Sequence, residues 1–269
     1  MTRTCSLPIL VIVLAGILCL LVPVQAREET FGIQRSRQVQ HDFDRTNLSG
    51  NRFVVDIIAG TISVTGHASS DIHAEIAILL EGKTESDLVQ AEEELQLIVE
   101  PIADGLLIFL DTPFRDRSVG YFDRSRNYRY RCDVVLQVPH DMILDLKTVI
   151  TGDIRLSGIN GDIQIENVTG NILLDNVVAG GAVKTVSGDI YLDYQKVPDL
   201  DLVLHSRFGE VYSGVDFQSL PTESLAVEKH GDMTRYYKDP HARIRLARGG
   251  RSMQVESLSG DILIQNTIN

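Results

Sequence analysis

The chain has 269 residues, of which 43% are hydrophobic and 23% charged, and its formal net charge at pH 7 is −12. A surface with this excess of acid repels nucleic-acid phosphate and anionic lipid, so the composition argues against both as general partners. The chain also contains no tryptophan, which weakens the usual argument for sugar stacking, although tyrosine remains available.

The first residues predict export. An uncharged apolar run covers residues 7–24, and Val24 and Ala26 occupy the third and first positions before the charged Arg27. This pattern is typical of a cleaved signal peptide over residues 1–26, which would place the remainder in the periplasm or outside the cell. The alternative is an uncleaved anchor, because the run approaches the roughly 18 apolar residues of a spanning helix. Contact with a membrane is expected only in that case.

One cysteine remains beyond the targeting segment. Cys5 and Cys19 lie within it, which leaves Cys132 without an intramolecular partner. An exported domain with one thiol has no internal disulfide framework, so its stability must come from a packed core. The alternating surroundings, RYRCDVVLQV, indicate that Cys132 is a buried strand residue rather than a reactive thiol.

The N-terminal half is predicted to be rich in strands. Residues 27–48 are polar without a clear period and are interpreted as a linker. Residues 49–140 contain alternating runs such as NRFVVDIIAGTISVTG and DIHAEIAILL. One helix is predicted near residues 87–96, where apolar residues recur at spacings of three and four behind Ser86 as a candidate N-cap.

A basic and aromatic segment, RDRSVGYFDRSRNYRYR, interrupts the acidic background at residues 115–131. Interleaved guanidinium groups and rings suit an anionic or sugar-like ligand. The alternative is a surface hairpin whose arginines pair with neighbouring acids. The candidate interaction patch comprises Arg115, Arg117, Tyr121, Arg124, Arg126, Tyr128, Arg129, Tyr130 and Arg131.

Residues 141–269 contain a nine-residue repeat. It reads TGDIRLSGI, NGDIQIENV, TGNILLDNV, VAGGAVKTV and SGDIYLDYQ over residues 151–195, and it returns as SGDILIQ near the C-terminus. The fourth and sixth residues share parity and are predicted to face the core, as in Ile154 and Leu156. The ninth position is expected to add an apolar group after the chain has turned, at Ile159, Val168, Val177 and Val186.

A single repeat cannot fold alone. Burying three aliphatic side chains contributes roughly 5–9 kcal/mol, whereas ordering nine residues costs about 9–18 kcal/mol. The repeats must therefore stack on one another. The predicted fold is all-β, a parallel β-solenoid or β-helix-like stack of short strands, with one short helix in the N-terminal part.

The glycines and acids of the repeat are interpreted as corner residues. Glycine permits the dihedrals of the bend, and the adjacent Asp or Asn can cap exposed backbone amides. Two units per coil would place Asp153, Asn171 and Asp189 in one column, with Asp162 opposite Gly180, and would keep carboxylates out of consecutive coils. That arrangement favours architecture over chemistry for these corner residues: Gly152, Asp153, Gly161, Asp162, Gly170, Asn171, Gly188, Asp189, Gly260 and Asp261.

Two chemical alternatives remain open. A calcium-stabilised roll would use the corner acids, but the several glycines of that motif are missing here. A β-helical polysaccharide-active enzyme would use outward acids, and Asp175 and Asp193 become neighbours under an 18-residue coil, with Glu166 between them in sequence. The seven histidines show no metal-ligand spacing. No catalytic residue, metal or cofactor is predicted.

The order of parts resembles the bacterial putative-adhesin family of strand-repeat domains, also called toastrack-like, over about residues 50–269. The matching features are AGTISVTG, the short acidic helix, VPHDMILDLKT, the serial GDI words and GGRSMQVESLSGDILIQ. The resemblance implies an exported, non-enzymatic domain that serves as an adhesin or interaction scaffold of the cell envelope. Its partner would be an envelope protein or a surface glycan. Exposed coil edges are a further route to self-association.

Overall fold

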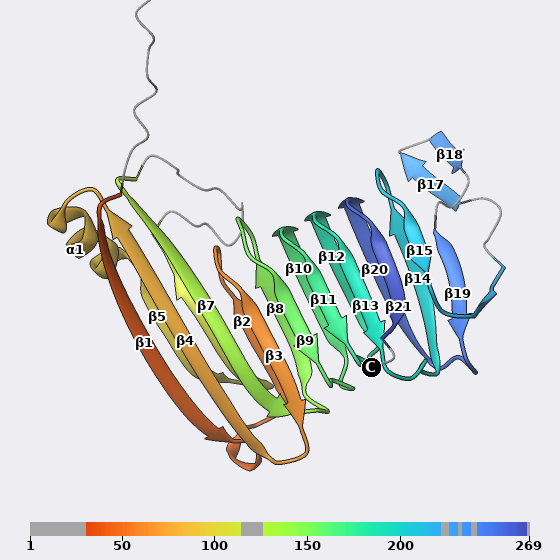
Figure 1. Cartoon of the computed structure of the whole chain (residues 1–269), viewed down its shortest axis with the longest axis horizontal. Helices are drawn as coiled ribbons and strands as arrows, with labels where there is room; N and C mark the ends of the chain where they lie inside the picture. The colour runs from red at the N-terminus through yellow and green to blue at the C-terminus, as the bar shows by residue number, and fades with distance from the viewer. Residues whose placement is uncertain (1–30, 114–125, 222–225, 231–232, 238–240, 268–269) are drawn as a thin grey trace, which may run out of the picture. The chain divides into compact units, whose positions relative to one another are not determined.

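The computed structural model describes residues 31–113, 126–221, 226–230, 233–237 and 241–267. These residues form mostly β-structure, with two large sheets and one α-helix (Figure 1). The predicted signal peptide over residues 1–26 lies outside the described residues. No helix in the described ranges is long and apolar enough to cross a membrane.

Nine strands form the first sheet. Their order across it is β1 (Ile33–Asp44), β4 (Asp71–Gly82), β7 (Tyr128–Pro139), β3 (Ile62–His67), β9 (Ile154–Ser157), β11 (Ile172–Asp175), β13 (Ile190–Tyr194), β21 (Ile262–Asn266) and β15 (Val211–Ser213).

Ten strands form the second sheet. Their order is β16 (Phe217–Ser219), β19 (Ala242–Leu246), β14 (Leu200–Ser206), β20 (Arg251–Ser259), β12 (Gly181–Ser187), β10 (Ile163–Thr169), β8 (Ile143–Thr148), β2 (Arg52–Asp56), β6 (Gly105–Asp111) and β5 (Gln96–Ile102). Outside the sheets lie the hairpin β17 (Ala226–His230) and β18 (Met233–Tyr237), the helix α1 (Glu85–Glu94) and the 3-10 turn η1 (Arg45–Asn47).

Successive nine-residue words alternate between the two sheets. The word at residues 151–159 forms β9 in the first sheet, and the next word forms β10 in the second. Strands pair in parallel at a spacing of 18 residues, as in Ile163 with Gly181 and Ile172 with Ile190. Two words, with one strand in each sheet, therefore make one unit, which we call a coil. Neighbouring coils are visible side by side in Figure 1 as β8/β9, β10/β11 and β12/β13.

The prediction of a purely parallel stack needs correction, because both sheets are mixed. Antiparallel pairs lie at both ends of each arrangement, in β1–β4–β7, β5–β6 and β14–β19–β16. Antiparallel neighbours need only a short return of the chain, whereas a parallel neighbour needs a full crossover. The parallel words supply the middle of each sheet, and hairpin-like returns supply the ends.

The chain does not add its coils in sequence order. The last word, in β20 and β21, lies between β12/β13 and β14/β15, and β20 pairs with both of its neighbours in parallel. The coil β2/β3 similarly lies between β6/β7 and β8/β9. The proposed division at residue 140 is consequently no structural boundary, since both parts contribute strands to both sheets.

Two N-terminal expectations also change. The predicted linker over residues 27–48 contains the strand β1, which pairs with β4 along its whole length. Its residues are mostly exposed, so the apolar alternation of a half-buried strand is absent. The helix α1 begins at Glu85, because Thr84 rather than Ser86 is its N-cap and forms a capping box with Asp87.

The core follows the predicted parity. The paired apolar residues at the fourth and sixth positions of the words are at most 2% exposed, as in Ile154 and Leu156. The ninth position behaves in two ways, since Ile159 and Val177 are buried whereas Val168 and Val186 are 38% and 43% exposed. The cause is strand length: β10 and β12 continue through this position, and their inward places go to polar residues, Asn167 and Thr185.

Cys132 is a buried residue of β7, as its sequence context predicts. Burial, with a smaller contribution from the charge of Asp133, raises the pKa of the Cys132 thiol to about 12. A thiol in an unfolded chain ionises near pH 8.5. The raised pKa therefore contributes stability below that pH, and this contribution declines as the pH rises towards 12.

We expect Cys132 to lower the stability of the protein in alkaline solution. In a chain carrying Cys5→Ser and Cys19→Ser, the free energy of unfolding should fall by about 1.4 kcal/mol per pH unit above pH 9 relative to the same chain with Cys132→Ala. Urea titrations between pH 7 and pH 10.5 measure this difference. Rapid reaction of the native thiol with a disulfide reagent at pH 8, or parallel stability curves for the two chains, would contradict the expectation.

Candidate functional site

The corner residues of the first sheet form a ladder of hydrogen bonds. Each side chain accepts a hydrogen bond from the backbone N–H of the equivalent residue in the next coil. The N–H of Asn171 donates to Asp153 Oδ1 at 3.0 Å, and that of Asp189 donates to Asn171 Oδ1 at 2.9 Å. The ladder continues at 2.8 Å from Asp261 to Asp189, and at 2.8 Å from Glu210 to Asp261.

The ladder uses these side chains as oxygen acceptors. Asn171 occupies the same place as its acidic neighbours, so the place requires an oxygen and no charge. The expected avoidance of carboxylates in consecutive coils does not hold for Asp189 and Asp261. The C-terminal word brings them together by entering the sheets beside β12 and β13.

Glycine at the corner is required by the closeness of the coils. Gly188 has φ +149°, and a Cβ there would lie 2.1 Å from the carbonyl oxygen of Gly170. Gly152, Gly170 and Gly260 also have positive φ and the same close approach to a neighbouring carbonyl. Only glycine tolerates both conditions without a shift of the backbone.

The second corner column lies at the other sheet. A Cβ on Gly180 would lie 2.9 Å from Asp162 Oδ1, so Asp162 faces Gly180 as the 18-residue spacing requires. Gly161 approaches the carbonyl oxygen of Met142 in the same manner. The carboxylate of Asp162 is mainly exposed and lies 3.6 Å from Arg251 Nη1.

The described residues of the basic segment have structural contacts. Arg126 Nη1 donates to both carboxylate oxygens of Glu94 at 2.6 Å, and the buried Tyr128 hydroxyl donates to the same carboxylate. Burial and the adjacent Glu94 raise the pKa of Tyr128 above its ordinary value. These contacts connect β7 to the last turn of α1. Arg115, Arg117, Tyr121 and Arg124 lie outside the described residues.

The remaining members of the patch point to different neighbours. The Arg129 guanidinium lies 4.2 Å from the centre of the Phe31 ring, Tyr130 packs against the core, and Arg131 Nε donates to Asp133 at 2.8 Å. The described part of the segment therefore offers no single array of guanidinium groups.

The acids considered for catalysis are brought together only in part. Asp175 and Asp193 are register partners on β11 and β13, whereas Glu166 lies on β10 in the other sheet. Burial and the neighbouring Asp175 raise the pKa of Asp193. Asp175 accepts hydrogen bonds from Ser157 at 3.1 Å and Asn176 at 2.8 Å. In the part of the chain that the structure describes, no group of three or more His, Cys, Asp or Glu side chains is placed to hold a metal ion.

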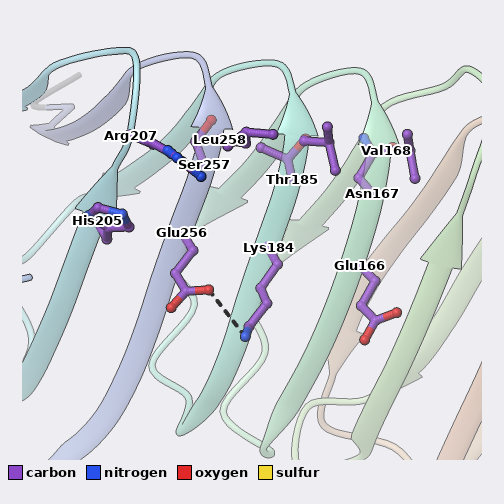
Figure 2. Close-up of a pocket in the computed structure, with 11 residues that line it drawn as sticks. Glu166, Asn167, Val168, Lys184, Thr185, His205, Arg207, Glu256, Ser257 and Leu258 are labelled. Atoms are coloured by element: carbon purple, nitrogen blue, oxygen red, sulfur yellow. Dashed lines mark ion pairs between the residues drawn. The ribbon is translucent and has the colours of Figure 1, made fainter. Parts of the chain in front are cut away.

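A shallow groove of about 410 Å³ crosses the outer face of the second sheet over β10, β12, β20 and β14 (Figure 2). Three aliphatic side chains stand in one row across it, namely Val168, Val186 and Leu258, and each is 38–43% exposed. His205 and Arg207 of the β14 segment lie at one end. Parallel strands bring such residues together at intervals of about 4.8 Å.

A row of paired charges borders the aliphatic row. Lys184 Nζ lies 3.1 Å from Glu256 Oε2, the ion pair drawn in Figure 2, and Lys147 Nζ lies 3.0 Å from Glu166 Oε2. Burial alone would raise the pKa of Glu256, but hydrogen bonds from Lys184 and Gln254 and the lysine charge hold it below its ordinary value. Since these charges neutralise one another, the aliphatic row is the distinctive feature of the groove.

Inward-pointing polar residues fix the backbone beneath the groove. Asn167 Nδ2 donates to the carbonyl oxygens of Gly152 at 3.1 Å and Gly170 at 3.0 Å, and Ser257 Oγ donates to that of Gly188 at 3.2 Å. The groove is therefore a rigid surface suited to docking. Sequence reasoning missed it because the ninth position was treated alike in every word. The available signal was the polar eighth residue, Asn167 or Thr185, which takes the inward place and turns the following valine outward.

The comparisons with known proteins follow the fold. No protein-family model matches the chain, and no curated protein matches it. A crystal structure of a putative cell adhesion protein from Clostridium sporogenes is similar, with 12% identity and a TM-score of 0.51, over 86% of this chain and 99% of that chain. The two proteins share a fold, and the expected resemblance to adhesin-type domains is supported to that extent.

Two weaker similarities carry no argument. A putative adhesin from Bacteroides fragilis matches at 12% identity and a TM-score of 0.28, over 85% of this chain and 97% of that chain. A putative lipid binding protein from Parabacteroides distasonis matches at 9% identity and a TM-score of 0.28, over 68% and 70% of the respective chains.

We expect Asp189→Ala to destabilise the protein by about 1–3 kcal/mol, because the N–H of Asp261 would lose its acceptor in a partly buried place. Asp189→Asn should remain within about 0.5 kcal/mol of the parent, since the amide oxygen can accept the same bond. Urea unfolding of the two variants checks this. A large loss in both variants would show that the charge of Asp189 is required.

Proposed function

We propose that the protein is an exported, non-enzymatic interaction protein of the cell envelope that binds another protein through the groove on the second sheet. The observation that carries the proposal is the row of Val168, Val186 and Leu258, which is exposed on a rigid surface with neutralised charges beside it. Contiguous exposed aliphatic side chains on a β-rich surface are typical of interaction sites.

The lining of the groove favours a protein over a glycan. It includes no Phe, Tyr or Trp, the side chains that stack on sugar rings. An aliphatic row bordered by charges suits a segment that inserts apolar side chains and keeps polar groups at the rim. The partner is therefore expected to present two or three aliphatic side chains to β10, β12 and β20.

A non-enzymatic role is supported by what the acids do. The corner acids of the first sheet accept backbone hydrogen bonds, and Glu166 and Glu256 are held in ion pairs with lysine. The Clostridium sporogenes protein that shares the fold is described as a putative cell adhesion protein, which is compatible with the proposal. Export is supported by the signal-peptide pattern of residues 1–26.

The proposal is tested by introducing a carboxylate into the groove. Val186 and Val135 are equally exposed, at 43% and 44%, but Val135 lies on β7 in the other sheet. Val186→Asp should weaken binding to the producing organism's envelope fraction by about tenfold or more, because an unpaired charge would be desolvated in the interface. Val135→Asp is the matched control and should bind as the parent does.

A photo-crosslinking residue at position 186 should capture one protein, and Leu258→Asp should abolish that capture. The same residue at position 135 should capture nothing at comparable yield. Equal capture at both positions, or binding that survives protease treatment of the envelope fraction and is lost after glycosidase treatment, would contradict the proposal.

A further inference from the structure

The two ends of the paired sheets differ in how the core is closed. At one end, α1 packs on β4, β1 and β7 and buries Leu88 and Ala91. At the other end lie the short strands β15 and β16, all of whose residues are exposed. Stacked repeats generally need a polar cap over the last unit, because the core would otherwise reach solvent.

The apolar core continues into this second end. Val211 is in register with Ile262, and Phe217 is in register with Leu246. Residues in register point to the same face of a sheet, and Ile262 and Leu246 are both 0% exposed. Val211 and Phe217 point the same way, yet they are 38% and 51% exposed. The space between the sheets is therefore uncovered at this end.

The surroundings add further apolar surface and an open strand edge. Phe208 is 74% exposed and Tyr212 is 53% exposed. Among the described residues, β15 pairs with β21 on one side only, so the backbone groups of its outer edge are available. Unlike the edge strand β5, which contains Pro101, β15 carries no proline to block pairing.

Two opposite charges flank the same edge. The Arg207 guanidinium lies 5.4 Å from the centre of the Phe208 ring, and no described carboxylate pairs with it. Glu210 ends the corner ladder: its N–H donates to Asp261, but its carboxylate receives no hydrogen bond or ion pair from the described residues. One unpaired cation and one unpaired anion on a single edge are complementary to a second copy of that edge.

We propose that this end is the interface of a two-fold dimer with a second copy of the chain. β15 pairs in antiparallel fashion with β15 of the second copy, and Val211 and Phe217 of each copy complete the core of the other. Arg207 lies opposite Glu210 of the second copy, and the reverse, as an isologous interface requires. The proposal goes beyond the groove and does not rest on it.

A head-to-tail arrangement is disfavoured by the opposite end. That end carries α1 and the edge strand β1, whose sequence IQRSRQVQHDFD is largely polar and whose residues are mostly exposed. It offers no apolar counterpart to Val211 and Phe217. Two copies joined through like ends form a closed pair, which leaves the groove on each copy outside the interface.

Sedimentation equilibrium of the full chain tests the dimer. The parent should be a dimer, and Val211→Asp should raise its dissociation constant at least tenfold. Glu210→Arg or Arg207→Glu alone should also weaken the dimer at least tenfold, because two like charges would then face each other. The double variant Arg207→Glu with Glu210→Arg should restore the parental constant.

Two controls separate this interface from other effects. Val186→Asp in the groove and Val135→Asp on the other sheet should leave the dissociation constant unchanged, and near-native thermal unfolding of each single variant should show that it folds. A monomer at every concentration, a series of growing oligomers, or a dimer that the double variant does not restore would overturn the proposal.

Discussion

The structure depends on the close parallel pairing of coils at the glycine corners of the first sheet. Gly188 and its equivalents allow one coil to approach the carbonyl oxygens of the next within the distance that a Cβ would occupy. At the same corner, a side-chain oxygen of one coil accepts the next coil's N–H, as in Asp153 and Asn171. The two features act together: glycine permits the approach, and the oxygen satisfies the amide that the bend would leave unpaired.

This constraint explains both the core and the groove. Once the corners fix the register at 18 residues, strand parity decides which side chains lie between the sheets. Short strands such as β11 end before the ninth position, so Val177 turns into the core. Longer strands such as β12 continue, and Val186 faces outward. One repeat thereby supplies an apolar interior and an aliphatic row on one outer face, and the proposed docking site arises from a difference of three residues in strand length.

The sequence predicted features that arise within the repeat, and it missed those set by distant segments. The inward pairs such as Ile154 and Leu156, the buried Cys132 and the existence of α1 follow from local periodicity and were correct. The strand β1 was missed because an exposed edge strand lacks apolar alternation. The insertion of the last word between earlier coils, which brings Asp189 beside Asp261, could not be predicted. The last word begins 72 residues after the equivalent word, four full coils, so periodicity is the same whether the coils are added in order or not.

The order of the coils is therefore the most direct test of this account. Ala182, Gln254 and Val203 are register neighbours across β12, β20 and β14, with Gln254 in the middle. In a chain with its native cysteines replaced by serine, oxidation should join paired cysteines at 182 and 254, and at 203 and 254, because adjacent strands are about 4.8 Å apart. Cysteines at 182 and 203 should remain unjoined at about twice that separation. Efficient joining of 182 to 203, without joining of either to 254, would contradict the account.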